Sequence, residues 1–120
     1  MKAAKIAGII ATTTTVSRAG LRTDIQQEGG LSGAPLFERS TAMIRQIHEA
    51  TDGEIPIIGV GGIRSGDDAV QYLLAGASLV ALGTASFADP RAALRVLNGL
   101  ERFGAFRRHG QEQFVIFAVV

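Results

Sequence analysis

Glycines follow two neighbouring apolar segments of this chain, at the point where each segment ends. Residues 55–60 run into Gly61 and Gly62, and residues 78–82 run into Gly83. Short runs rich in Ile, Val and Leu are typical of buried strands in a parallel sheet. Glycine leaves the backbone N–H groups around it bare, and neighbouring bare N–H groups can bind an anion. The two turns therefore predict an anion site made of backbone amides.

Two stretches upstream could complete such a site. Residues 12–15 are four threonines that follow a third apolar run, residues 6–11, and Gly33 lies in a glycine-rich loop at residues 29–35. Threonine hydroxyls at a strand end can bind a polar ring or a carboxylate, but threonine also suits a strand that simply continues. One glycine turn is equally consistent with a tight connection that binds nothing. Three such turns after strands of one sheet favour a shared anion-binding mouth.

Helical segments separate the predicted strands. A helix at residues 40–50 is predicted to be capped by Ser40 or Thr41. Residues 65–75 form a second helix, with Ser65 and Asp68 at capping-box spacing, an inward stripe that includes Leu74, and a stop at Gly76. A third helix starts at Asp89-Pro90 and ends near Gly104. Strands that alternate with helices predict an α/β fold with parallel strands and right-handed connections.

Length limits how large this fold can be. The chain has 120 residues, whereas a complete eight-stranded β/α barrel needs about 250. Glycine turns after the last two strands of such a barrel form a phosphate site. We therefore predict three parallel βα units, the C-terminal portion of a TIM (β/α)8 barrel, at residues 1–107, and an unassigned tail at residues 108–120. The apolar run at residues 114–120 fits an extra strand, an oligomer contact or sequence that is not native.

Composition limits the classes of binding partner and ligand that the chain is expected to have. A net charge of +1 gives no reason to expect nucleic acid or an anionic membrane as a partner. The absence of Cys excludes disulfides and thiolate metal sites, which fits a cytoplasmic protein. No apolar stretch approaches the ~20 residues of a membrane span. Arg18 and Arg22 could pair with a phosphate but are more typical of solvated loops. His48 and His109 have no partner at catalytic spacing, and no metal site is predicted.

Four segments together resemble the C-terminal part of dihydroorotate dehydrogenase: residues 8–18, 28–36, 57–63 and 75–80. The first two are most similar to the quinone-dependent class, whereas residues 83–90 look like the soluble class. The resemblance implies FMN-dependent oxidation of dihydroorotate to orotate in pyrimidine biosynthesis. It also implies quinone as a candidate electron acceptor, with a peripheral position at the inner membrane in that case.

The same resemblance implies roles for individual residues. It implies FMN contacts at Thr12, Gly33, Gly62, Gly83 and Thr84, the last four through backbone N–H groups to the phosphate, and substrate contacts at Thr13 and Thr14. The family normally has Asn where this chain has Thr13, and a Thr hydroxyl cannot satisfy two groups as an amide does. The family's proton-abstracting Ser or Cys lies upstream of the matching segments, so no catalytic residue is predicted here.

Three functional hypotheses follow from these residues. The chain is a segment of a flavoenzyme, a non-catalytic half-barrel that binds phosphate or FMN, or an inactive fragment. Because an open sheet exposes apolar edges, we also expect the chain to associate with itself or to belong to a longer protein. Binding of FMN separates the inactive fragment from the other two hypotheses, and bleaching of bound flavin by dihydroorotate separates those two from each other.

Overall fold

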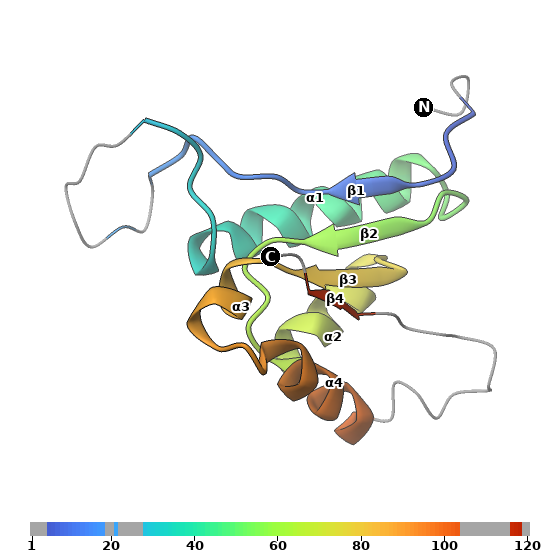
Figure 1. Cartoon of the computed structure of the whole chain (residues 1–120). Helices are drawn as coiled ribbons and strands as arrows, with labels where there is room; N and C mark the ends of the chain where they lie inside the picture. The colour runs from blue at the N-terminus through green and yellow to red at the C-terminus, as the bar shows by residue number, and fades with distance from the viewer. Residues whose placement is uncertain (1–4, 19–20, 22–27, 104–115, 119–120) are drawn as a thin grey trace.

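A four-stranded parallel sheet organises the molecule, in the order β1-β2-β3-β4 (Figure 1). The structure is a computed structural model and describes residues 5–18, 21, 28–103 and 116–118. The strands are β1 (Ile9–Ala11), β2 (Ile57–Val60), β3 (Leu79–Leu82) and β4 (Ile116–Ala118), and the helical elements are η2 (Ala34–Leu36), α1 (Phe37–Ala50), α2 (Gly66–Ala75), α3 (Thr84–Ala88) and α4 (Ala92–Arg102). The predicted α/β fold with three parallel βα units is confirmed, and α3 and β4 add to it.

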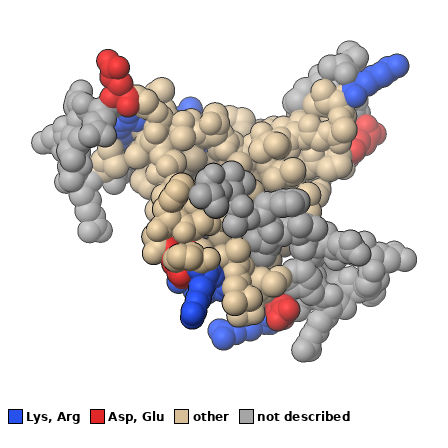
Figure 2. Space-filling model, in the orientation of Figure 1, with Lys and Arg blue, Asp and Glu red and all other residues tan. Residues whose placement is uncertain are grey.

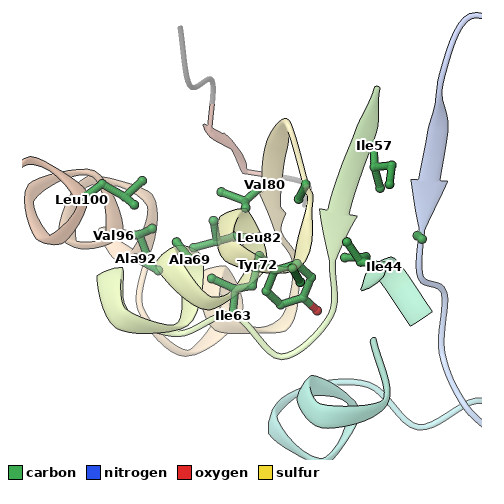
Figure 3. Close-up of a cluster of buried hydrophobic side chains, with 13 residues drawn as sticks. Ile44, Ile57, Ile63, Ala69, Tyr72, Val80, Leu82, Ala92, Val96 and Leu100 are labelled. Atoms are coloured by element: carbon green, nitrogen blue, oxygen red, sulfur yellow. The ribbon is translucent and has the colours of Figure 1, made fainter. Parts of the chain in front are cut away.

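The core lies between the sheet and the helices that cover one of its faces. Val96 and Leu100 of α4 point toward Val80 and Leu82 of β3, and all four side chains are buried (Figure 3). α2 and α4 cross closely, because a Cβ built on Gly66 would lie 2.5 Å from the Cα of Gly99. Burying side chains of this size contributes about 1.5–3 kcal/mol each, so this layer stabilises the fold.

Tyr72 of α2 fills the part of the core between α1 and β2. Its ring packs edge-on against Phe37 of α1, with ring centroids 5.5 Å apart, and lies against the backbone of Gly59. Its hydroxyl donates a hydrogen bond to the carbonyl of Gly61, in the turn after β2. Burial raises the pKa of Tyr72 to about 12, because the charged phenolate is poorly solvated there. The predicted inward position of Leu74 is wrong: Leu74 is 76% exposed, and Tyr72 faces the core instead.

Helix starts agree with the sequence signals in one case and differ in two. The backbone N–H of Asp68 donates to Ser65 Oγ at 3.2 Å, which confirms the predicted cap of α2. α1 begins before the predicted cap, so Ser40 is buried inside the helix and serves a tertiary contact. α4 begins at Ala92, two residues after Pro90, because the Asp89 carboxylate first accepts the N–H of Arg91 at 2.9 Å. The predicted end of this helix, Gly104, lies outside the described residues.

The two edges of the sheet differ. β4 pairs with β3, so residues 116–118 of the predicted tail form the extra strand that the apolar run allowed. The rest of the 108–120 tail lies outside the described residues. At the other edge, β1 pairs only with β2 among the described strands, and Ile10 there is 71% exposed. Charged side chains lie toward the periphery of the face shown in Figure 2 and over α4.

Candidate functional site

A cavity of about 230 Å³ lies at the carboxyl ends of β1, β2 and β3. The arrowheads of β1 and β2 in Figure 1 point toward this side of the sheet, where α3 and the start of α1 also lie. All seven residues predicted to contact FMN or substrate line this one cavity: Thr12, Thr13, Thr14, Gly33, Gly62, Gly83 and Thr84. The structure therefore brings together residues that are up to 72 positions apart in the chain (84 − 12). Their roles toward a ligand stay predictions.

Gly62 brings the turn after β2 against the loop that carries Gly33. Its φ of +70° lies in the left-handed region that glycine tolerates. A Cβ at Gly62 would lie 2.9 Å from the carbonyl oxygen of Gly33 and 2.9 Å from the backbone nitrogen of Phe37. No other residue type fits this contact without moving the backbone, so glycine is needed here for both reasons.

The turn after β3 leaves open space beside the backbone. A Cβ built on Gly83 would meet no atom within 4 Å. Within the described residues, no hydrogen bond is donated by the backbone N–H groups of Gly33, Gly62, Gly83 or Thr84. Buried or half-buried N–H groups are nearly always paired in proteins. Gly33, Gly62 and Gly83 are half-buried, whereas Thr84 is exposed. Because these donors line one cavity, they form a set that an anionic oxygen could satisfy.

Residues 28–33, just before η2, are held in place by specific contacts, and Ser32 and Gly33 among them line the cavity. Thr15 and Leu31 exchange two backbone hydrogen bonds of 3.0 and 2.7 Å and form an antiparallel bridge. The hydroxyls of Ser32 and Thr84 lie 2.9 Å apart and join the loop to the turn after β3. Arg18 donates to the carbonyl of Gly29 at 2.7 Å, so it holds the loop itself. Arg22 lies outside the described residues.

The threonines differ in what their hydroxyls do. The Thr12 hydroxyl bonds with that of Ser40, and the Thr12 N–H donates to Val60 at 2.8 Å, so Thr12 ties β1 to α1 and β2. Thr13 and Thr14 are exposed, and within the described residues their hydroxyls form no hydrogen bond. Thr12 is thus partly committed to the protein, whereas the hydroxyls of Thr13 and Thr14 are available to a ligand.

Sequence reasoning missed two residues that shape the site. Ser40 was predicted as a helix cap, but its buried hydroxyl meets Thr12, 28 positions away, and no local signal could have shown this. Arg64 also lines the cavity. Its position directly after Gly61-Gly62-Ile63 was a signal that could have been used, because residues next to a glycine turn share its surroundings.

Comparisons with known proteins match this site and fold. The family described as dihydroorotate dehydrogenase matches residues 1–103. A Gloeobacter violaceus protein named dihydroorotate dehydrogenase (quinone) is 55% identical over 80 residues, covering 67% of this chain and 23% of its own length. A Thermosynechococcus vestitus protein of the same name is 47% identical over 110 residues, covering 83% of this chain and 30% of its own length.

Solved structures agree with the sequence relatives. The crystal structure of ligand-free DHODH from Eimeria tenella superposes with a TM-score of 0.81 at 35% identity, covering 89% of this chain and 30% of that one. The complex of the Eimeria tenella enzyme with ferulenol gives a TM-score of 0.78 at 36% identity, with coverages of 85% and 28%. Dihydroorotate dehydrogenases are β/α barrels, so the predicted barrel portion is confirmed. This chain, which spans 23–30% of the length of these relatives, belongs to the dihydroorotate dehydrogenase family.

Proposed function

We propose that this chain forms the phosphate-binding C-terminal part of a barrel that oxidises dihydroorotate to orotate with FMN, in pyrimidine biosynthesis. The observation that carries the proposal is the single cavity in which three turns present N–H groups that have no acceptor within the described residues. A phosphate carries a charge of about −1.5 to −2 at pH 7 and several strong acceptor oxygens, which suits such a set of donors. The open space at Gly83 and the glycine at position 62 also fit a ligand that approaches the backbone closely.

In this proposal the chain's residues bind and orient ligands. The N–H groups of Gly33, Gly62, Gly83 and Thr84 hold the FMN phosphate, and Thr12 keeps β1 in place beside it. When bound, FMN supplies the two-electron acceptor for dihydroorotate oxidation. The hydroxyls of Thr13 and Thr14 orient the substrate, as donors or acceptors. We assign no proton-abstracting residue to this chain, because none of its serines matches the family's base.

Titration of the purified chain with FMN and with riboflavin tests the phosphate site. Flavin fluorescence reports binding, and the two flavins differ only by the phosphate. We expect FMN to bind at least about tenfold more tightly, because charge-assisted hydrogen bonds to the phosphate are lost with riboflavin. Equal affinity for the two flavins would contradict a phosphate site. No binding of either flavin would favour the inactive fragment.

A chimera tests the activity. The segment of this chain that matches the Gloeobacter violaceus protein replaces the corresponding segment there, and dihydroorotate is added without oxygen. Bleaching of the bound flavin supports the proposed oxidation. FMN binding without bleaching would support the non-catalytic binding module instead. The Thr13→Asn variant of the chimera restores the amide typical of the family, and we expect it to bind orotate more tightly than the chimera with Thr13.

Two further parts of the proposal concern partners. We propose quinone as the electron acceptor and a peripheral position at the inner membrane, supported by the relatives named dihydroorotate dehydrogenase (quinone). Within the described residues no helix is long and apolar enough to cross a membrane. Delivery of electrons from dihydroorotate to a quinone rather than to fumarate or NAD⁺, measured with the complete protein, checks the acceptor.

For the 120-residue chain on its own, outside a barrel, we also propose self-association at the β1 edge. β4 covers the edge of β3, which leaves β1 as the uncovered edge of the described sheet, with Ile10 71% exposed beside it. Unpaired strand edges of this kind associate readily. Sedimentation of the chain and of its Ile10→Lys variant measures this association. The proposal expects a dimer that the variant weakens, and a monomeric wild-type chain would contradict it.

A further inference from the structure

Arg64 is placed to supply a full positive charge to the cavity. Among the described residues that line the cavity, Arg64 alone is ionisable, and the others are glycines, threonines, a serine and aliphatic residues. Backbone N–H groups contribute partial charges, whereas a phosphate bears one to two full negative charges at pH 7. The described cavity therefore has one side chain that could neutralise its ligand by an ion pair.

The backbone of Arg64 is fixed by the start of α2. Its N–H donates to the Asp68 carboxylate at 2.9 Å, and the N–H of Asp68 donates in turn to Ser65 Oγ at 3.2 Å. These bonds hold the Cα of Arg64 next to the Gly62 turn, while the side chain stays exposed. The position from which the guanidinium reaches out is thus set by a capped helix.

The guanidinium itself has no partner in the described part of the chain. It forms no ion pair and no hydrogen bond there, although Asp68 uses its carboxylate on the Arg64 backbone. By contrast, Arg95 pairs with Asp89 at 2.9 Å and Arg18 donates to loop carbonyls. A guanidinium forms two parallel hydrogen bonds to a phosphate, which gives such pairs both strength and orientation.

We propose that the Arg64 guanidinium pairs with the phosphate of a flavin mononucleotide bound on the Gly62 and Gly83 amides, and that it sets the preference of the site for the phosphorylated flavin. This inference rests on the proposed function of the cavity. Arg39 provides the internal comparison, because it is exposed and lines a neighbouring groove together with Arg64 but does not line the cavity.

The test compares FMN and riboflavin binding by the 120-residue chain and its Arg64→Gln, Arg64→Lys and Arg39→Gln variants, at several salt concentrations. We expect Arg64→Gln to weaken FMN binding about tenfold, as loss of a charge-assisted pair would, and to leave riboflavin binding unchanged. Its FMN affinity should also depend less on salt, because fewer charges are screened. Arg64→Lys should retain part of the affinity, since it keeps the charge and loses the planar fork. Arg39→Gln should match the wild type.

The outcomes distinguish the role of Arg64 from the phosphate site formed by backbone amides. If Arg64→Gln keeps the wild-type ratio of FMN to riboflavin affinity, the role of Arg64 is overturned and the amide site stands. If Arg64→Gln weakens both flavins equally, Arg64 acts on the structure and the inference also fails. If the wild-type chain binds neither flavin or does not distinguish them, both the proposed function and the inference are overturned.

Discussion

Leu82 and Gly83 are neighbours in the chain, yet they belong to two regions that are built differently. Leu82 lies on the helix-covered side of the sheet with no exposed surface, packed toward α4. At Gly83 a Cβ would meet no atom within 4 Å. The first region fills its space, as protein interiors do, whereas the second leaves space and N–H groups without partners among the described residues. The difference indicates which part of the fold serves stability and which part serves a ligand.

The largest expected effect comes from shortening a buried side chain in the packed region. Leu82→Ala should lower the free energy of unfolding by about 2–5 kcal/mol, because it removes buried methyl groups and leaves a cavity. Urea denaturation followed by circular dichroism measures this. The variant that still folds should keep the wild-type ratio of FMN to riboflavin affinity. A change in that ratio comparable to the change in stability would show that the two regions are not separate.

The next substitution changes the neighbouring residue with the opposite result. Gly83→Asp should leave the free energy of unfolding nearly unchanged, because the space beside Gly83 is open. It should weaken FMN binding on the order of 100-fold, because a carboxylate repels the phosphate and its hydrogen bonds are lost. Flavin fluorescence titration measures the affinity, with Gly83→Ala as the uncharged control. Equal losses for Asp and Ala would mean that volume rather than charge matters at this turn.

The two regions also differ in how far sequence could predict them. The glycine turns of the cavity and the Ser65 cap were predictable, because glycine after a buried strand and Ser three residues before Asp are local signals. The seven predicted residues meet in one cavity because parallel strands place their carboxyl ends at one edge. Their ligand roles were predicted from the family resemblance.

The packed region was harder to predict in detail. The expected apolar stripe of α2 included Leu74, which is 76% exposed, whereas Tyr72 on another side of the helix is buried against Gly59. The space over Gly59 that accepts the ring is formed by a distant strand, so the sequence of α2 alone does not reveal it. Ser40 resembled a helix cap, yet its hydroxyl partner comes from β1. The apolar tail was equally consistent with an extra strand, an oligomer contact or non-native sequence, and it forms β4. The sequence of a short strand does not indicate which sheet edge the strand joins. Contacts between distant residues decided all three.

Tyr72 joins the two regions, and its titration tests that link. Its ring belongs to the core, while its hydroxyl holds the Gly61 carbonyl in the turn after β2. The pKa is about 12 in the folded chain and about 10 when unfolded. The unfolded chain therefore loses this proton first, so the contribution to stability is complete below pH 10 and is lost as pH rises toward about 12.

Tyr72 is the single tyrosine of the chain, so tyrosinate absorbance reports it alone. We expect a midpoint near 12 in the folded protein and near 10 in denaturant. The free energy of unfolding of the Tyr72→Phe variant should be about 1 kcal/mol lower at pH 7, because the hydrogen bond to Gly61 is lost. The stability of this variant should also lack the part of the decrease between pH 10 and about 12 that comes from titration of Tyr72. A folded midpoint near 10 would show that the hydroxyl is solvated and does not anchor the turn.

The smallest expected effect concerns the hydroxyl contact between Ser32 and Thr84, two residues that line the cavity. The hydroxyls of Ser32 and Thr84 lie 2.9 Å apart in an exposed setting, where a hydrogen bond contributes little to global stability. Ser32→Ala should therefore leave unfolding unchanged and weaken FMN binding about threefold, because the loop that carries Gly33 is held less firmly. Ser78→Ala, an exposed serine just before β3, is the matched control. An effect as large as that of Gly83→Asp would place the Ser32 hydroxyl itself on the ligand, and the loop would then bind directly rather than position its neighbours.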